Sequence, residues 1–102
     1  MMDRIERELE LLDRHVDVLT QVMEAEPIGI TSLSNELGYP EHQVRYSLRK
    51  LEHNDLVEPT KSGAVATDRA PASLDELDRH FSAVIDRLDR QRAAFVRART
   101  EA

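Results

Sequence analysis

Apolar residues recur at intervals of three and four positions over most of the chain, which is the periodicity of helices with one buried face. The pattern predicts two long helices, over residues 3–24 and 74–99, and two short helices, over residues 31–37 and 40–54. These four segments predict a mostly α-helical protein in which two short helices lie between two long ones.

The segment 40–54 has one apolar face and one polar face. A rotation of 100° per residue places four residues within one narrow arc, namely Val44, Ser47, Leu48 and Leu51. We expect this arc to be buried. The opposite face and its flanks carry groups that can donate hydrogen bonds, stack on rings and attract phosphate: His42, Tyr46, Arg49, His53, Arg45 and Lys50.

The preceding segment predicts a shorter helix that ends in a turn. Thr31 is expected to cap its start, and Leu33 and Leu37 form its inward pair. Gly38 follows at the position where a left-handed residue ends a helix, and Pro40 suits the first turn of the next helix. Together the two short helices have the layout of a helix-turn-helix, which commonly places its second helix in a DNA groove.

Both long helices carry a continuous heptad seam of apolar residues, and Ser73 with Glu76 is expected to form a capping box at the start of the second. That helix would be on the order of 39 Å long, which exceeds what a compact domain of this size can cover. We therefore expect a homodimer with a coiled-coil-like interface formed by Leu74, Leu77, Phe81, Val84, Leu88, Phe95, Ile5, Leu9 and Leu12. Packing of the two helices within one chain is the alternative.

The charge distribution bears on the choice of partner. Among 102 residues there are 20 acids and 14 bases, for a net charge of −6, and all but two of the bases are arginine. Eight of the acids lie in residues 1–26, whereas residues 41–61 hold four acids and four bases. This composition resembles that of proteins from salt-loving archaea. At their ionic strength the Debye length falls to about 3 Å or less, so repulsion between an acidic surface and DNA is largely screened.

Other kinds of chemistry have few candidates in the chain. The absence of cysteine excludes disulfides and thiolate metal sites, and the histidines lack metal-ligand spacing. We find no glycine-rich phosphate loop and no nucleophile paired with a histidine, so we expect neither an enzyme nor a bound cofactor. No apolar run has membrane length and no leader is evident, which predicts a cytoplasmic protein without a membrane partner.

The order of elements over residues 18–70 resembles a winged helix-turn-helix regulator of the MarR and ArsR kind. After the two short helices come an outgoing strand, a hairpin tip and a returning strand, at residues 56–58, 61–63 and 64–67. Ser34 stands where the family usually has Ala, and Asp55 where it usually has Gly. Because Asp tolerates positive φ better than most residues, we expect the turn at Asp55 to be kept.

The resemblance implies a fold that is mostly α with a small β-hairpin, a winged helix-turn-helix flanked by long N- and C-terminal helices. Residues 1–70 would form the winged unit. Within it, the helix-turn-helix would occupy residues 31–54 and the wing residues 56–67. Residues 71–102 would form the C-terminal dimerisation helix.

The implied function is that of a sequence-specific transcriptional regulator. A homodimer would present two recognition helices, residues 40–54, to successive major grooves of double-stranded DNA. The expected DNA contacts are His42, Gln43, Arg45, Tyr46, Arg49 and Lys50 on that helix, Thr31 and Ser32 on the helix before it, and Lys61 at the wing tip. A competing interpretation keeps the fold and makes the protein an adaptor that binds another protein without DNA.

Overall fold

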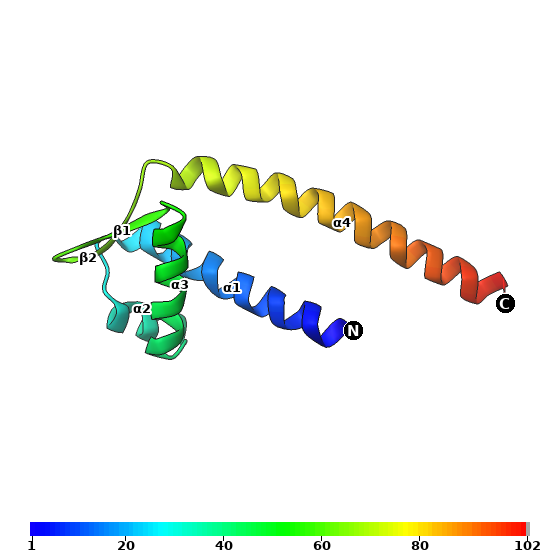
Figure 1. Ribbon diagram of the computed structural model, residues 1–102, viewed down its shortest axis with the longest axis horizontal. Helices are drawn as coiled ribbons and strands as arrows, with labels where there is room; N and C mark the ends of the chain where they lie inside the picture. The colour runs from blue at the N-terminus through cyan, green and yellow to red at the C-terminus, as the bar shows by residue number, and fades with distance from the viewer. Residues whose placement is uncertain (102) are drawn as a thin grey trace. The chain divides into compact units, whose positions relative to one another are not determined.

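The computed structural model describes residues 1–101, which form four helices and one two-stranded antiparallel hairpin (Figure 1). In chain order the elements are α1 (Met2–Ala25), α2 (Ile30–Leu37), α3 (Glu41–His53), β1 (Val57–Thr60), β2 (Gly63–Ala66) and α4 (Ala70–Glu101). The prediction of a mostly α-helical protein with a small β-hairpin is confirmed.

The chain divides into two compact units, of which the first is Met1–Ala70 and the second begins at Pro71. In the first unit α1 contacts α2, α3 and β2, and α3 also contacts α2 and β1. The second unit consists of α4 from Pro71 onward. Residue 102, the last residue of the expected dimerisation helix, lies outside the described residues.

The core of the first unit forms where α1, α2 and α3 meet. Val18 and Val22 of α1, Leu33 of α2 and Val44 of α3 have no exposed surface. The buried residues of α3 are the four that its apolar arc predicts, Val44, Ser47, Leu48 and Leu51. The buried residues of α1 all lie in its C-terminal half, so its N-terminal half extends beyond this core.

The starts and ends of the short helices follow local backbone chemistry. Gly38 ends α2 in the left-handed conformation, with φ 79°, as expected. Helix α2 begins at Ile30, because the amide of Leu33 donates to the carbonyl of Gly29 at 3.0 Å. The expectation that Thr31 caps this helix is therefore wrong. Pro40 is the residue that precedes α3.

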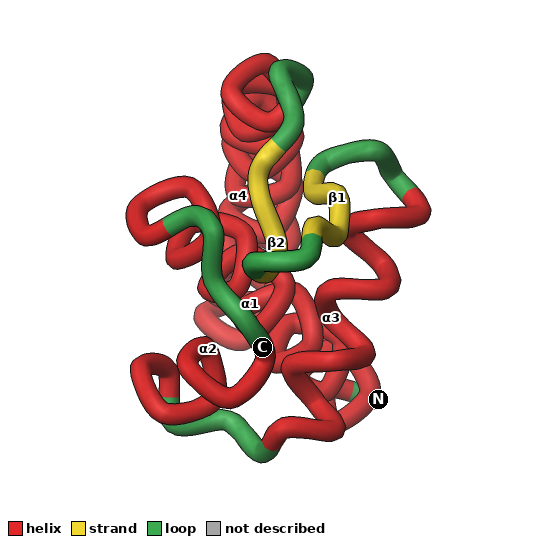
Figure 2. The backbone as a smooth tube through the Cα atoms, turned by 90° about the vertical axis from the view of Figure 1, so that its left-hand side faces the viewer, coloured by secondary structure: helices red, strands yellow, loops and turns green. Residues whose placement is uncertain are grey.

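The hairpin pairs Val57 with Ala66 and Thr60 with Gly63, and Figure 2 shows its strands side by side. Asp55 enters the hairpin with φ 60°, so the turn is kept as expected. A third segment joins the sheet, because Ile28 exchanges two backbone hydrogen bonds with Ala64, of 2.8 and 3.1 Å. The hairpin is thereby tied to the connection between α1 and α2.

Helix α4 begins earlier than its sequence pattern indicates. The amide of Ala70 donates to the carbonyl of Thr67, and the Thr67 hydroxyl accepts a hydrogen bond from the amide of Arg69 at 3.3 Å. Ser73 and Glu76 consequently lie inside the helix, and the expected capping box is wrong. None of the helices formed by residues 1–101 combines the length and the apolar character that crossing a membrane requires.

Candidate nucleic-acid interface

The exposed face of α3 carries basic side chains. Arg45, Arg49 and Lys50 are exposed, whereas Val44 and Leu51 on the opposite face are buried. Within residues 1–101 the ion pairs are formed by other residues, so none of these three cations is neutralised by a carboxylate. Three positive charges therefore reach solvent from one face of one helix.

Hydrogen-bonding groups lie at the two ends of this face. His42 in the first turn and His53 at the last residue of α3 are exposed, and Gln43 is half-buried. Imidazole and amide groups can both donate and accept hydrogen bonds, which is what recognition of base edges requires. The face thus has cations in its middle and groups that can donate and accept hydrogen bonds at its two ends.

Tyr46 departs from its expected position. Its side chain is 42% exposed, but its ring stacks on that of His15 in α1, with centroids 6.0 Å apart and planes inclined by 26°. The guanidinium carbon of Arg14 lies 6.0 Å from the ring centroid, and Nζ of Lys50 lies 5.6 Å from it. The expectation that Tyr46 points away from the protein is therefore wrong in part, because α1 covers one side of the ring.

Ser47 supplies the hydroxyl that joins α3 to α1. Arg14 Nε donates a hydrogen bond to Ser47 Oγ at 3.1 Å, and His15 Nδ1 lies 2.8 Å from the same oxygen. A hydroxyl has one hydrogen and two lone pairs, so it can accept from Arg14 while it donates to a neutral His15. The fully buried Ser47 is thus satisfied by two partners from one helix.

The surroundings of His15 favour its neutral form. Burial lowers the pKa of His15 below its ordinary value of 6.5, and the positive charges of Arg14 and Lys50 lower it further. At neutral pH the ring is therefore uncharged, and its Nδ1 can accept the Ser47 hydrogen. The cluster of Arg14, His15, Tyr46 and Ser47 fixes where α1 crosses α3.

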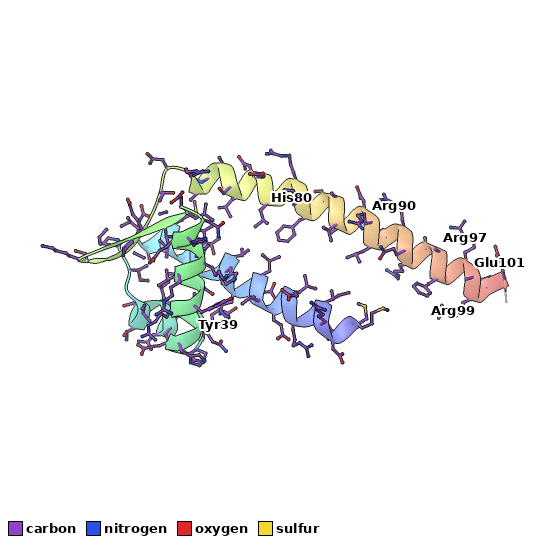
Figure 3. All side chains as sticks on the ribbon, in the orientation of Figure 1. Tyr39, His80, Arg90, Arg97, Arg99 and Glu101 are labelled. Atoms are coloured by element: carbon purple, nitrogen blue, oxygen red, sulfur yellow. The ribbon has the colours of Figure 1, made fainter. Side chains whose placement is uncertain are left out.

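A second link joins α1 to the start of α3. The hydroxyl of Tyr39, which is labelled in Figure 3, donates to Asp17 Oδ2 at 2.6 Å. This hydrogen bond, followed by desolvation and the negative charge of Asp17, raises the pKa of Tyr39 to about 12. Ser34 donates through Oγ to the carbonyl of Tyr39 at 2.6 Å. Both contacts hold the turn from which α3 emerges.

Thr31 and Ser32 are exposed in the first turn of α2. Thr31 Oγ1 donates to Glu41 Oε1 at 2.6 Å, which ties the start of α2 to the start of α3. A carboxylate in the first turn of a helix is stabilised by the helix dipole. A phosphate beside Thr31 would therefore meet a negative charge, and Glu41 would have to move for that contact to form.

Lys61 is exposed at the tip of the hairpin. The tip and the C-terminal half of α3 line one surface groove of about 390 Å³, to which α3 contributes Leu48 and Glu52. Lys61 therefore lies near the C-terminal half of α3, whereas Thr31 contacts its first residue. The same groove is lined by Gly29 and Ile30, which directly precede Thr31 in the chain.

The residues expected at a dimer interface are largely exposed. In α1, the side chains of Ile5 and Leu9 are 44% and 51% exposed, and with the half-buried Leu12 they line a groove of about 500 Å³. In α4, Leu74 and Leu77 are half-buried. The other expected residues of α4 are exposed, namely Phe81, Val84, Leu88 and Phe95.

Sequence reasoning missed three residues of this region, Arg14, His15 and Ile28. The one available signal for the first two is Ser47, because a hydroxyl within an otherwise apolar arc indicates a polar partner on the facing element. Ile28 contributes a single bridge to the sheet, and a bridge of one residue has no strand periodicity.

Within residues 1–101, no three His, Asp or Glu side chains come together as a metal site. No protein-family model matches the chain, and no curated protein matches it. Its function is therefore inferred from the side chains of α3 and their surroundings.

Proposed function

We propose that the protein is a sequence-specific DNA-binding transcriptional regulator that acts as a homodimer. In this proposal α2, the turn and α3 form a helix-turn-helix, and the β1–β2 hairpin is its wing. Helix α3 then enters the major groove and reads base edges there. The resemblance to MarR and ArsR regulators leads to the same assignment.

The observation that carries the proposal is the set of exposed cations on α3, Arg45, Arg49 and Lys50. Within residues 1–101 Arg69 is the only lysine or arginine that forms an ion pair, so the three cations of α3 are distinguished by their common exposure on one helix and not by the lack of a carboxylate partner. They lie beside His42 and Gln43, which can bond base edges. Contacts to phosphate and contacts to base edges are the two kinds of contact that sequence recognition needs.

The three cations suit different contacts. Arg45 and Arg49 are four residues apart, so they lie on the same side of α3 about 6 Å apart along its axis. An arginine can bond the O6 and N7 atoms of guanine with two parallel hydrogen bonds. Lys50 lies over the ring of Tyr46, toward α1, and a compact ammonium there suits a phosphate oxygen.

The acidic balance of the chain sets the conditions for binding. Each phosphate contact normally contributes a slope of about −0.9 to log K against log salt, through release of counterions. At molar salt this driving force is weak, but so is repulsion between DNA and the acids of α1. We therefore expect base contacts to contribute most of the affinity at high salt.

The homodimer is proposed from the exposed apolar residues of α1 and α4. A contiguous apolar stripe on a monomer is the ordinary sign of a partner surface. Two copies of α3, related by two-fold symmetry, would then bind two half-sites separated by one helical turn or a small multiple of it.

A second candidate function is a protein-binding adaptor, and the setting of Tyr46 favours it. Tyr46 is 42% exposed and has cations of Arg14 and Lys50 against its ring. Tyrosine and arginine are enriched at the centres of protein interfaces. The same surface therefore has a composition that would also suit a protein partner.

Selection from a random double-stranded DNA pool, in molar potassium chloride and again at physiological salt, tests the proposed function. We expect enrichment of a two-fold symmetric motif. If neither condition enriches a motif, while Tyr46→Ala abolishes binding of a purified protein partner, the adaptor function replaces the regulator.

A further inference from the structure

The stripe of apolar residues on α4 is long enough to define how a second copy would lie on it. We infer that two α4 helices pair antiparallel, in the register that places Asp78 beside the partner's Arg92. This inference rests on the homodimer of the proposed function and adds its geometry. Each Met1–Ala70 unit would then be attached at an opposite end of the pair.

The α4 stripe consists of the heptad positions Leu74, Leu77, Phe81, Val84, Leu88, Gln91, Phe95 and Ala98. From Phe81 onward its members are exposed in the single chain: the side chain of Leu88 is 50% exposed and that of Phe95 is 74% exposed, whereas Leu74 and Leu77 are half-buried. Helix α4 has 32 residues, which corresponds to a length on the order of 48 Å. Spacings of three and four residues suit a second helix that follows the stripe along this length.

The charges of α4 are segregated along its length, which argues for antiparallel pairing. Residues 71–86 contain four acids and one arginine, whereas residues 87–101 contain five arginines and two acids. Charges at the two ends of a helix also complement its dipole, but only within the first and last turns. Asp78, Asp86, Arg87 and Arg92 lie well inside α4. Antiparallel pairing brings the acidic half of each helix against the basic half of the other.

The positions that flank the stripe give the same answer. In a parallel pair, Arg87 of one helix faces the partner's Arg92, and this repulsive contact occurs twice. In the antiparallel pair, Asp78 lies beside the partner's Arg92, and two-fold symmetry makes this attractive contact occur twice. Arg87 then lies beside the partner's Arg87, a repulsive contact that occurs only once, at the two-fold axis. Figure 3 shows Arg90 and Arg97 on one side of α4 and Arg99 on the other. Arg90 and Arg97 lie opposite the stripe, so they contact the partner helix in neither the parallel nor the antiparallel pair.

Side-chain volumes along the stripe also favour the antiparallel pair. A parallel pair would stack Phe95 on the partner's Phe95 and leave Ala98 facing the partner's Ala98, which gives one crowded layer and one empty layer. The antiparallel register instead places Phe95 against the partner's Leu77 and Ala98 against the partner's Leu74. Alternation of large and small residues across facing positions fills such a seam without voids.

The register follows from using the whole stripe. When Val84 faces the partner's Leu88, all eight positions have a facing partner, and a shift of one heptad leaves end positions unpaired. In this register Ile85 flanks the two-fold axis and lies beside the partner's Ile85. The side chain of Ile85 is 55% exposed and lies outside the stripe, so this arrangement also covers a large apolar residue that the heptad seam leaves in solvent.

Single spin labels test the orientation directly, because residues 1–101 contain no cysteine to be removed. In the antiparallel pair a label at Asp75→Cys lies level with the partner's Arg97, so the two labels are on the order of 33 Å apart along the axis. A label at Asp86→Cys lies near the two-fold axis, so its pair is separated mainly by the width of two helices. A long distance for Asp75→Cys and a short one for Asp86→Cys support the inference. Short distances for both overturn it and leave the dimer in place.

Charge variants provide an independent readout, measured as the dimer dissociation constant at low ionic strength. Arg92→Asp should weaken the antiparallel dimer roughly tenfold, because it turns two attractive contacts into repulsive ones. The double variant Asp78→Arg with Arg92→Asp should restore it. Arg90→Asp, with the same charge change on the outer face, should leave it unaltered. If Arg92→Asp instead tightens the dimer, the helices pair in parallel.

Failure of the antiparallel inference can be distinguished from failure of the proposed function. A monomeric mass by light scattering, or no dipolar coupling between labels at either position, overturns both this inference and the homodimer. DNA selection tests the regulator without reference to helix orientation. A dimer that selects a DNA motif and gives short label distances at both positions overturns the antiparallel inference alone.

Discussion

Ser47 brings a hydroxyl to the buried face of α3, and two side chains of α1 converge on it. Arg14 and His15 lie 33 and 32 positions away in the chain, so their contacts with Ser47 Oγ fix the crossing of two distant segments. Tyr46 stacks on the same His15, so His15 links the buried Ser47 to a residue on the exposed face of α3. The orientation of that face thus depends on a residue that itself touches no solvent.

Ser47→Ala should lower the free energy of unfolding of the first unit by about 1–3 kcal/mol, because Arg14 Nε and His15 Nδ1 lose a buried partner. Urea titration followed by tyrosine fluorescence isolates this unit, since both tyrosines of the chain lie in it and there is no tryptophan. Ser82→Ala, at an exposed position of α4, makes the same chemical change and should shift stability by less than about 0.5 kcal/mol. Equal shifts for the two variants would contradict a structural role for the Ser47 hydroxyl.

His15 should make stability depend on pH. Its folded-state pKa lies below 6.5, so the folded protein binds a proton less readily than the unfolded chain. The resulting stability is fully present above pH 6.5 and is lost as the pH falls below it and through the lower folded-state pKa. Urea titrations between pH 7.5 and 5 should therefore show a decline that is smaller in His15→Gln. His80→Gln is the control and should keep the decline of the native chain. If His15→Gln shows a decline of the same size as the native chain, another group is responsible for the pH dependence.

At the residue scale, the apolar pattern within a single helix predicted which residues are buried more reliably than it predicted the surroundings of the exposed ones. The buried arc of α3 depends only on the apolar pattern of α3, and all four of its residues are buried. The environment of Tyr46 depends on where α1 crosses, which no pattern within α3 contains. Arg14 and His15 lie on a helix whose dominant signal is its apolar seam, so their role in contacting α3 could not be predicted from it.

At the element scale, the hairpin is held by its bridge to Ile28, and Gly63 makes the close approach possible. Gly63 has φ 130°, and a Cβ built on it would lie 2.6 Å from the backbone carbon of Ile28. Real side chains do not approach a backbone that closely. The bridge connects the hairpin to the segment between α1 and α2, so it also fixes the position of the hairpin tip that carries Lys61.

Gly63→Ala should therefore destabilise the first unit by more than Gly38→Ala, for which about 1–2 kcal/mol is expected. Gly38 also has a positive φ, of 79°, but a Cβ there would meet nothing within 4 Å. Both variants introduce backbone strain, and only Gly63→Ala adds the steric clash with Ile28. Urea titration followed by tyrosine fluorescence measures the stability of each variant. If the two variants are equally destabilised, the bridge does not contribute to stability.

The elements themselves could be predicted well, and their starts poorly. The expected helix 40–54 and the observed α3, Glu41–His53, differ by one residue at each end. The caps expected at Thr31 and Ser73 are wrong in the same direction, because both helices begin earlier. Gly29 starts α2 through its carbonyl, and Thr67 starts α4 through its carbonyl and hydroxyl. Sequence reasoning identified the first side chain of a type that commonly caps a helix. In the structure each helix begins earlier, at a backbone carbonyl that accepts its first hydrogen bond.

At the scale of the whole molecule, charge is distributed by element. The acids are concentrated in residues 1–26, α3 exposes cations, and α4 carries an acidic half and a basic half. This separation is visible in the sequence and needs no coordinates. The contribution of the structure is the finding that Arg45, Arg49 and Lys50 are all exposed on α3. The net charge alone would have argued against DNA as a partner.

The central claim is that the exposed face of α3 binds DNA, and the affinity of Arg49→Ala for a selected duplex tests it most directly. Fluorescence anisotropy in molar potassium chloride would measure binding to that duplex and to duplexes changed at one base pair each. We predict a loss of about 1–3 kcal/mol for Arg49→Ala, with discrimination lost at one position of each half-site, and no loss for Arg97→Ala. Unchanged affinity of Arg49→Ala, or equal losses for both variants, would contradict the claim.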